Sequence, residues 1–291
     1  MLQRIPELKA LFYKLLLAYI FFTFSRTLFI YYNLDIIPVN SLKEFFWLCY
    51  LGIRFDTTSI LYLVSPFILM TIIPGVFTTN INYQKVSRAF YFIGGGLGLA
   101  FNFIDIAYYR FNLMRMNAYF LESLENETNI KTLFFHFFYE YFYLIAIYSI
   151  LIAVWIYFYN KVRNPIVIIK SKRNYIFESF FLFFGVIALC VGGVRGGDFK
   201  HSTRPIGTIH AMEKVTNPQH ADIVLNTPFS ILRTLGKTTI QAQNKFNYKD
   251  VKEVTLPVKH YPNNKIDSIK PNVVVFILES FGREYWGALN E

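Results

Sequence analysis

Residues 11–32 read LFYKLLLAYIFFTFSRTLFIYY, an apolar block whose only charge after Lys14 is Arg26. At a rise of about 1.5 Å per residue, a helix of this length crosses the roughly 30 Å hydrocarbon core of a bilayer. The block has no small-residue cleavage site, so it is typical of a membrane anchor and not of a removable signal peptide. It therefore predicts a transmembrane helix.

Four more apolar blocks follow the first one. They cover residues 53–76, 89–109, 141–159 and 175–194. The composition agrees, since 54% of the residues are hydrophobic and only 16% are charged, which excludes an ordinary soluble domain. We predict a five-helix transmembrane domain over residues 1–194. The intervening stretches 33–52 and 112–140 are expected to contain helices that lie in the membrane interface.

The third block contains Gly94 and Gly98, which are separated by three residues. Small residues at this spacing allow helices to approach one another closely. The pattern predicts tight packing inside the bundle, and a dimer interface is the alternative.

Loop charges predict the orientation of the chain. The N-terminus, the loop with Lys85 and Arg88, and residues 160–174 are basic, whereas the alternate loops carry Asp35, Glu44 and further acids. The positive-inside rule places the basic segments in the cytoplasm and everything after Arg195 outside. The net charge of +10 is scattered among apolar blocks, so we expect contact with anionic lipid headgroups and no nucleic-acid partner.

Several ionisable residues lie near the outer ends of the predicted spans. They are Arg26, Arg54, Asp56, Asp105, Arg110 and Arg115. Charges in or near a membrane are functional candidates because they are costly there. Our hypothesis is that Arg26, Asp56 and Asp105 form a buried polar network and that Arg54, Arg110 or Arg115 meets a lipid phosphate. The alternative is structural pairing that fixes helix packing.

The C-terminal stretch contains a second kind of apolar run. Asn272 to Leu278 is rich in β-branched residues and too short to span a bilayer, so it predicts a strand buried in a parallel sheet. Glu279 follows at the carboxyl end of that strand, where catalytic groups gather in open α/β sheets. The carboxylate suits a divalent cation there, and capping of a following helix is the alternative.

The segment from Asn272 to Ser280, with Glu284 and Gly287 behind it, resembles the first strand of the lipoteichoic acid synthase (phosphoglycerol transferase) branch of the sulfatase/alkaline phosphatase superfamily. The segments 195–197, 204–205 and 226–229 also resemble the linker of this family. The resemblance implies a membrane domain, an extracytoplasmic linker over 195–270 and the beginning of a sulfatase-like domain over 271–291. It implies a bacterial cytoplasmic membrane as the location.

In that family the glutamate that closes this strand binds manganese or magnesium. A threonine nucleophile and a later aspartate–histidine pair lie beyond Glu291, so the resemblance assigns Glu279 as a metal ligand and leaves this chain alone inactive. The implied substrates are a phospholipid donor and a glycolipid or glycan acceptor. A phosphoethanolamine transferase, a sulfatase and a catalytically silent truncated membrane protein remain open.

Residues 199–270 are polar and rich in proline, with helical patterns between His210 and Leu235. The histidines here, His201, His210, His220 and His260, show no metal-ligand spacing, so we interpret them as ordinary linker residues.

Overall fold

Helices form almost all of the regular structure that the computed structural model describes, which covers residues 3–120, 130–162, 165, 167, 169–196 and 206–236. These residues belong to the first of two units, Met1–Lys237. The helices are α1 (Ile5–Tyr32), α2 (Leu42–Leu63), α3 (Ser65–Ile72), η1 (Val76–Thr79), α4 (Ile81–Asn112), α6 (Ile130–Glu140), α7 (Phe142–Lys161), α8 (Lys172–Val194), η2 (Thr208–Ala211), α9 (His220–Val224) and α10 (Thr227–Thr234). The predicted strand and Glu279 lie outside the described residues.

Within the described part of the chain, α1, α4, α7 and α8 are each long and apolar enough to cross a membrane. The pair α2 and α3 meets the same criterion when it is counted as one span, with a bend of 67° between its halves. These helices confirm the coarser part of the prediction, a mostly helical chain with four to five apolar helices that could span a membrane.

The bend between α2 and α3 has a local cause. Pro66 lies in the first turn of α3, where its missing N–H group needs no helical partner, and the chain turns at Val64. At the far end of α3, the Arg4 side chain donates to the carbonyl of Ile72 at 3.1 Å, and the Gly75 N–H donates to the hydroxyl of Tyr175 at 3.0 Å. The bent pair therefore ends where α1 and α8 begin.

The start of α2 corrects one predicted boundary. We expected a separate interfacial helix before Gly52 and a span from residue 53, but one continuous helix begins at Leu42. Ser41 caps it by accepting a hydrogen bond from the N–H of Glu44 at 3.1 Å. Because the cap lies at Ser41, the polar and apolar halves of the expected segment share a single helix.

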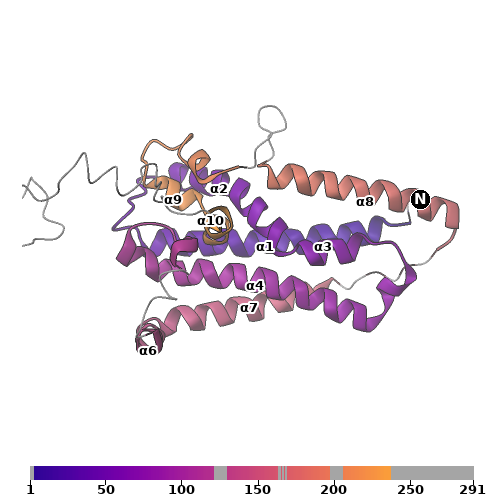
Figure 1. Ribbon diagram of the computed structural model, residues 1–291, viewed down its shortest axis with the longest axis horizontal. Helices are drawn as coiled ribbons and strands as arrows, with labels where there is room; N and C mark the ends of the chain where they lie inside the picture. The colour runs from indigo at the N-terminus through magenta and orange to yellow at the C-terminus, as the bar shows by residue number, and fades with distance from the viewer. Residues whose placement is uncertain are drawn as a thin grey trace, which may run out of the picture. The chain divides into compact units, whose positions relative to one another are not determined.

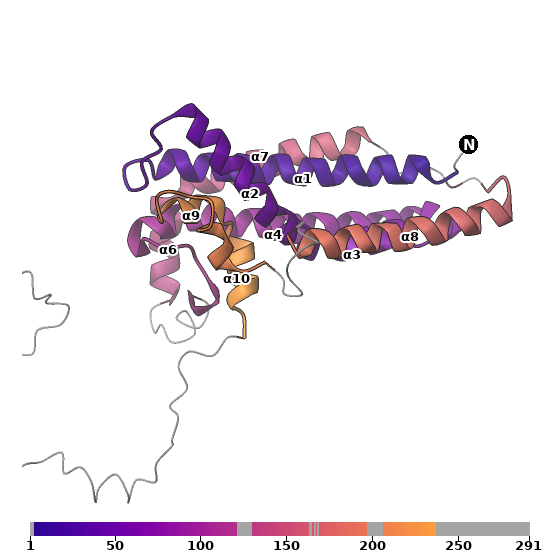
Figure 2. The ribbon, with the colours of Figure 1, turned by 90° about the horizontal axis from the view of Figure 1, so that it is seen from above.

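α1 packs against α2, α4 and α7, whereas α8 packs against α2 and α3 (Figures 1 and 2). The glycines of α4 permit this closeness, since a Cβ atom on Gly94 would lie 2.0 Å from the carbonyl oxygen of Leu63. Gly98 likewise faces Phe22 and Leu63. The predicted role of the Gly94/Gly98 spacing in packing within the bundle is confirmed.

The segment after the last span folds back onto the bundle. α9 and α10 lie beside α1, α2 and α4, at the end opposite to the N-terminus (Figures 1 and 2). Ile223, Thr227 and Phe229 are fully buried in this contact. Residues 206–236 of the predicted linker are therefore part of the same packed unit as the spans.

Candidate functional site

The connection between α9 and α10 presents a row of backbone groups to the bundle. α9 ends at Val224, and Leu225 and Asn226 are extended. The Asn226 side chain caps α10 by accepting a hydrogen bond from the N–H of Phe229 at 2.8 Å, with Pro228 in the first turn. This geometry directs the free carbonyls at the end of α9 toward α1 and α2.

Arg26 of α1 binds these carbonyls. Its guanidinium donates to the carbonyls of Ile223, Val224 and Leu225, the last two at 2.6 and 3.0 Å. It also forms an ion pair with Asp56 of α2 at 2.5 Å, and both side chains are almost fully buried. The predicted expensive charge in the first span is thus neutralised and holds the end of α9 against the bundle.

A glycine on α2 makes room for this guanidinium. A Cβ atom on Gly52 would lie 2.3 Å from Cζ of Arg26, and the Gly52 carbonyl accepts a hydrogen bond from the same side chain at 3.3 Å. A side chain at position 52 would therefore displace the Arg26 guanidinium.

Asp56 has a second partner from the docked segment. The Asn226 amide donates to the Asp56 carboxylate at 2.7 Å, and its oxygen accepts from the hydroxyl of Ser59 at 2.7 Å. Asn226 thus caps α10 and joins it to α2 at the same time.

Asp105 of α4 forms a separate buried ion pair with Arg115, at 2.8 Å. Asp105 also accepts hydrogen bonds from the N–H of Met116 at 2.9 Å and the hydroxyl of Thr227 at 2.7 Å. Arg115 donates to the carbonyls of Asp222 and Leu225 at 2.6 and 3.0 Å. Both ion pairs therefore hold the connection between α9 and α10, and both arginines donate to the carbonyl of Leu225.

Asn102 links the two halves of the network. Its oxygen accepts from the N–H of Thr227 at 3.0 Å, and its amide donates to the hydroxyl of Ser25, one residue before Arg26. The structure thus brings Arg26, Asp56 and Asp105 into one buried polar region, with Asp56 and Asp105 in different ion pairs. Removal of one member of such a pair leaves an uncompensated charge, which costs about 3–5 kcal/mol.

Arg115 and Arg110 were both predicted as candidates for contact with a lipid phosphate, and the structure places them in different environments. The Arg115 side chain is only 5% exposed, and its Cζ lies 3.6 Å from the centre of the Phe29 ring, so its partners are buried groups of the protein. Arg110 is exposed and pairs with Asp35 at 2.7 Å, and this hydrogen bond lowers the pKa of the Asp35 carboxyl. The pKa of the Asp222 carboxyl is shifted in the opposite direction, because burial raises it.

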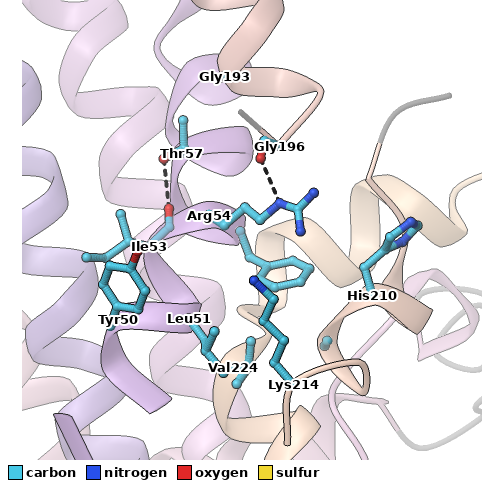
Figure 3. A pocket seen from close by; sticks show the side chains of 12 residues that line it. Tyr50, Leu51, Ile53, Arg54, Thr57, Gly193, Gly196, His210, Lys214 and Val224 are labelled. Atoms are coloured by element: carbon cyan, nitrogen blue, oxygen red, sulfur yellow. Dashed lines mark hydrogen bonds between the residues drawn. The ribbon is translucent and has the colours of Figure 1, made fainter. Parts of the chain in front are cut away.

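Arg54 lies apart from the network and lines a cavity of about 310 Å³. Its Nε donates to the carbonyl of Gly196 at 2.7 Å. In Figure 3 the Arg54 and Lys214 side chains extend into the same space from α2 and from the segment after η2, with His210 across from them. The structure thus places Arg54, a predicted lipid-contact residue, in a cavity with Lys214 and His210.

The metal prediction is tested by none of these contacts. Within the ranges that the structure describes, no three His, Cys, Asp or Glu side chains are grouped as metal ligands. His220 is buried, with its Nε2 3.0 Å from the carbonyl of Pro38, and His210 lies at the cavity. Assignment of manganese or magnesium to Glu279 stays a prediction.

Comparison of the chain with protein-family models, with curated proteins and with solved structures gives no match.

Sequence reasoning missed the partners supplied by residues 220–227. Asn226 and Pro228 carry a visible signal, because asparagine followed by proline two positions later is a typical helix start. That signal predicts α10, but it does not say that the carbonyls before it bind Arg26 and Arg115. Gly52 has no distinguishing neighbour in the sequence, and its role follows from the packing of α1 on α2.

Proposed function

We propose that this chain is the membrane portion of an enzyme that transfers a phosphate-containing headgroup from a phospholipid to an extracytoplasmic acceptor. In this reaction, the bond between phosphorus and the diacylglycerol oxygen breaks, and a bond to the acceptor hydroxyl oxygen forms. The acceptor proton passes to the diacylglycerol that leaves. A divalent ion held in part by Glu279 would neutralise charge on the phosphoryl oxygens.

The observation that carries the proposal is the buried attachment of the connection between α9 and α10. Two ion pairs, Arg26–Asp56 and Asp105–Arg115, fix the chain after the last span to the end of the bundle. A passive anchor needs only an apolar helix. An enzyme that acts on a lipid benefits when the chain that leads to its catalytic domain leaves the membrane bundle at a fixed distance from the bilayer. The attachment fixes that point at Leu235, directly after α10.

The proposed orientation follows from charge and from the arrangement of the bundle. Arg4, just before α1, meets the first turns of α8 through Glu178, which accepts from the Arg4 N–H at 3.1 Å. The basic segments before α1 and before α8 therefore share one end, which the positive-inside rule assigns to the cytoplasm. α9 and α10 lie at the other end, which we assign to the outside.

The test uses the complete reading frame, reconstituted in liposomes that contain phosphatidylglycerol. We expect manganese-dependent release of diacylglycerol, which Glu279→Gln abolishes and Glu279→Asp reduces. Release from phosphatidylethanolamine alone would instead favour the phosphoethanolamine transferase. A reading frame without a later threonine and aspartate–histidine pair, or release that Glu279→Gln leaves unchanged, would refute the proposal.

A further inference from the structure

The cavity beside Arg54 lies at the level where a membrane span ends. α8 runs from Lys172 to Val194, and a helix of that length measures about 34 Å, close to the thickness of the hydrocarbon core. Gly193 and Gly196, at the end of α8 and just beyond it, line the cavity. Its polar wall is therefore at the depth of lipid phosphates.

Aromatic residues of α2 mark the same level. Trp47 and Tyr50 stack on each other and are 46% and 65% exposed. Tryptophan and tyrosine concentrate at the membrane–water interface, because their rings are apolar and their N–H or O–H groups are polar. Tyr50 also lines the cavity, and the Trp47 N–H donates to the carbonyl of Lys214 at 3.4 Å.

The backbone at Gly196 is shaped around Arg54. Gly196 has a φ of +90°, which a side chain rarely tolerates, and an added Cβ would lie 2.7 Å from Nε of Arg54. The hydrogen bond from Nε to the Gly196 carbonyl fixes the guanidinium at the cavity wall. The two terminal nitrogens extend beyond it (Figure 3).

Charge in the cavity is positive. Among the described residues, no carboxylate forms an ion pair with Arg54 or Lys214, whereas His210 lies 3.9 Å from Glu213. Leu51, Phe55 and Val224 supply an apolar wall next to these cations. The volume of the cavity, about 310 Å³, is at the lower end of the range for small-molecule sites, about 300–1,000 Å³.

We infer that this cavity binds the phosphate group of an anionic lipid, with Arg54 and Lys214 on the phosphate oxygens and the acyl chains on the apolar side. A planar guanidinium and a lysine ammonium are the usual partners of phosphate. The inference rests on the proposed function in one respect, namely that the bound lipid is the donor. Binding itself needs no turnover, so it can be measured separately.

The experiment measures lipid binding to the full 291-residue chain in maltoside micelles by microscale thermophoresis. The probes are dioctanoyl phosphatidylglycerol, dioctanoylglycerol with the same chains but no phosphate, and inorganic phosphate. We expect saturable binding of phosphatidylglycerol that Arg54→Gln and Lys214→Gln each weaken about tenfold. Lys85→Gln is the matched control, since it removes the same charge from an exposed residue at the start of α4.

Lys214 is exposed, so Lys214→Gln leaves folding intact even if Arg54→Gln does not. Arg54→Lys should retain part of the affinity. Wild-type affinity in Lys214→Gln, or equal affinity for dioctanoylglycerol, overturns the inference. Equal affinity for inorganic phosphate assigns the site to a free anion and overturns the assignment to a lipid. Glu279→Gln should bind phosphatidylglycerol normally, so loss of transfer with intact binding separates the two proposals.

Discussion

Exchange of the two charges in the Arg26–Asp56 pair should fail to restore stability. The double variant Arg26→Asp/Asp56→Arg keeps an ion pair of the same kind. It also removes the guanidinium from the backbone carbonyls that Arg26 now binds, those of Ile223, Val224, Leu225 and Gly52. A carboxylate has no hydrogen to donate, so the carbonyls of Ile223 and Val224 lose the donor that Arg26 supplies. The Leu225 carbonyl keeps its hydrogen bond from Arg115, and the Gly52 carbonyl keeps its place in helix α2.

The magnitude follows from the contacts. Each single variant should cost about 3–5 kcal/mol, because it leaves an unpaired buried charge. In the double variant, the two carbonyl oxygens of Ile223 and Val224 that lose their donor, at about 2 kcal/mol each, leave the protein roughly 4 kcal/mol less stable than the wild type. A pair that acts only through its own attraction would instead recover to within about 1 kcal/mol.

The assay is unfolding of the full chain in mixed micelles by increasing dodecyl sulfate, followed by the fluorescence of the buried Trp155. The exposed Asp35–Arg110 pair provides the control, since its exchange should shift the midpoint little. A double variant as stable as the wild type would refute the role of the α9 carbonyls. It would leave Arg26 with a simple part in helix pairing.

Two further outcomes are expected. Gly52→Ala should lower the unfolding midpoint strongly, because its Cβ displaces the Arg26 guanidinium. Gly185→Ala on α8, where the Cβ would meet nothing within 4 Å, should leave the midpoint unchanged or raise it slightly. Equal effects of the two substitutions would contradict the close packing at Gly52. Burial raises the pKa of Asp222, so the folded chain holds that proton more tightly than the unfolded chain, and stability should fall as pH rises from about 4 through the raised pKa. Asp222→Asn, which still accepts from Tyr109, should weaken this fall and increase stability at pH 7, and an unchanged pH profile would contradict the assignment.

The spans were predictable because their signal is local. A run of about twenty apolar residues is sufficient to favour a helix across a bilayer, whatever its neighbours are. The predicted blocks correspond to α1, the α2–α3 pair, α4, α7 and α8. The observed helix boundaries differ from the predicted ones where a capping residue sets them, as Ser41 does for α2. An interfacial helix and a span can join into one helix without a change in composition.

The identity of the charged candidates was also predictable, since an ionised side chain near a membrane is costly and therefore noticeable. Their partners were not. Arg26 and Asp56 are far apart in sequence, and the carbonyls at the end of α9 are almost two hundred residues from Arg26. Nothing in the sequence states that Arg115 pairs with Asp105 inside the protein while Arg110 pairs with Asp35 outside it.

Hydrophobicity and charge act residue by residue, so the amino-acid order is sufficient to predict several membrane-spanning helices and to identify the costly charges within them. Tertiary packing brings residues 220–227 back to the bundle, where Arg26 and Arg115 donate hydrogen bonds to backbone carbonyl oxygens. It also separated Arg54, which lines an open cavity, from its buried counterparts. The reason is that the environment of a charge depends on which distant segments surround it, and that depends on packing in three dimensions.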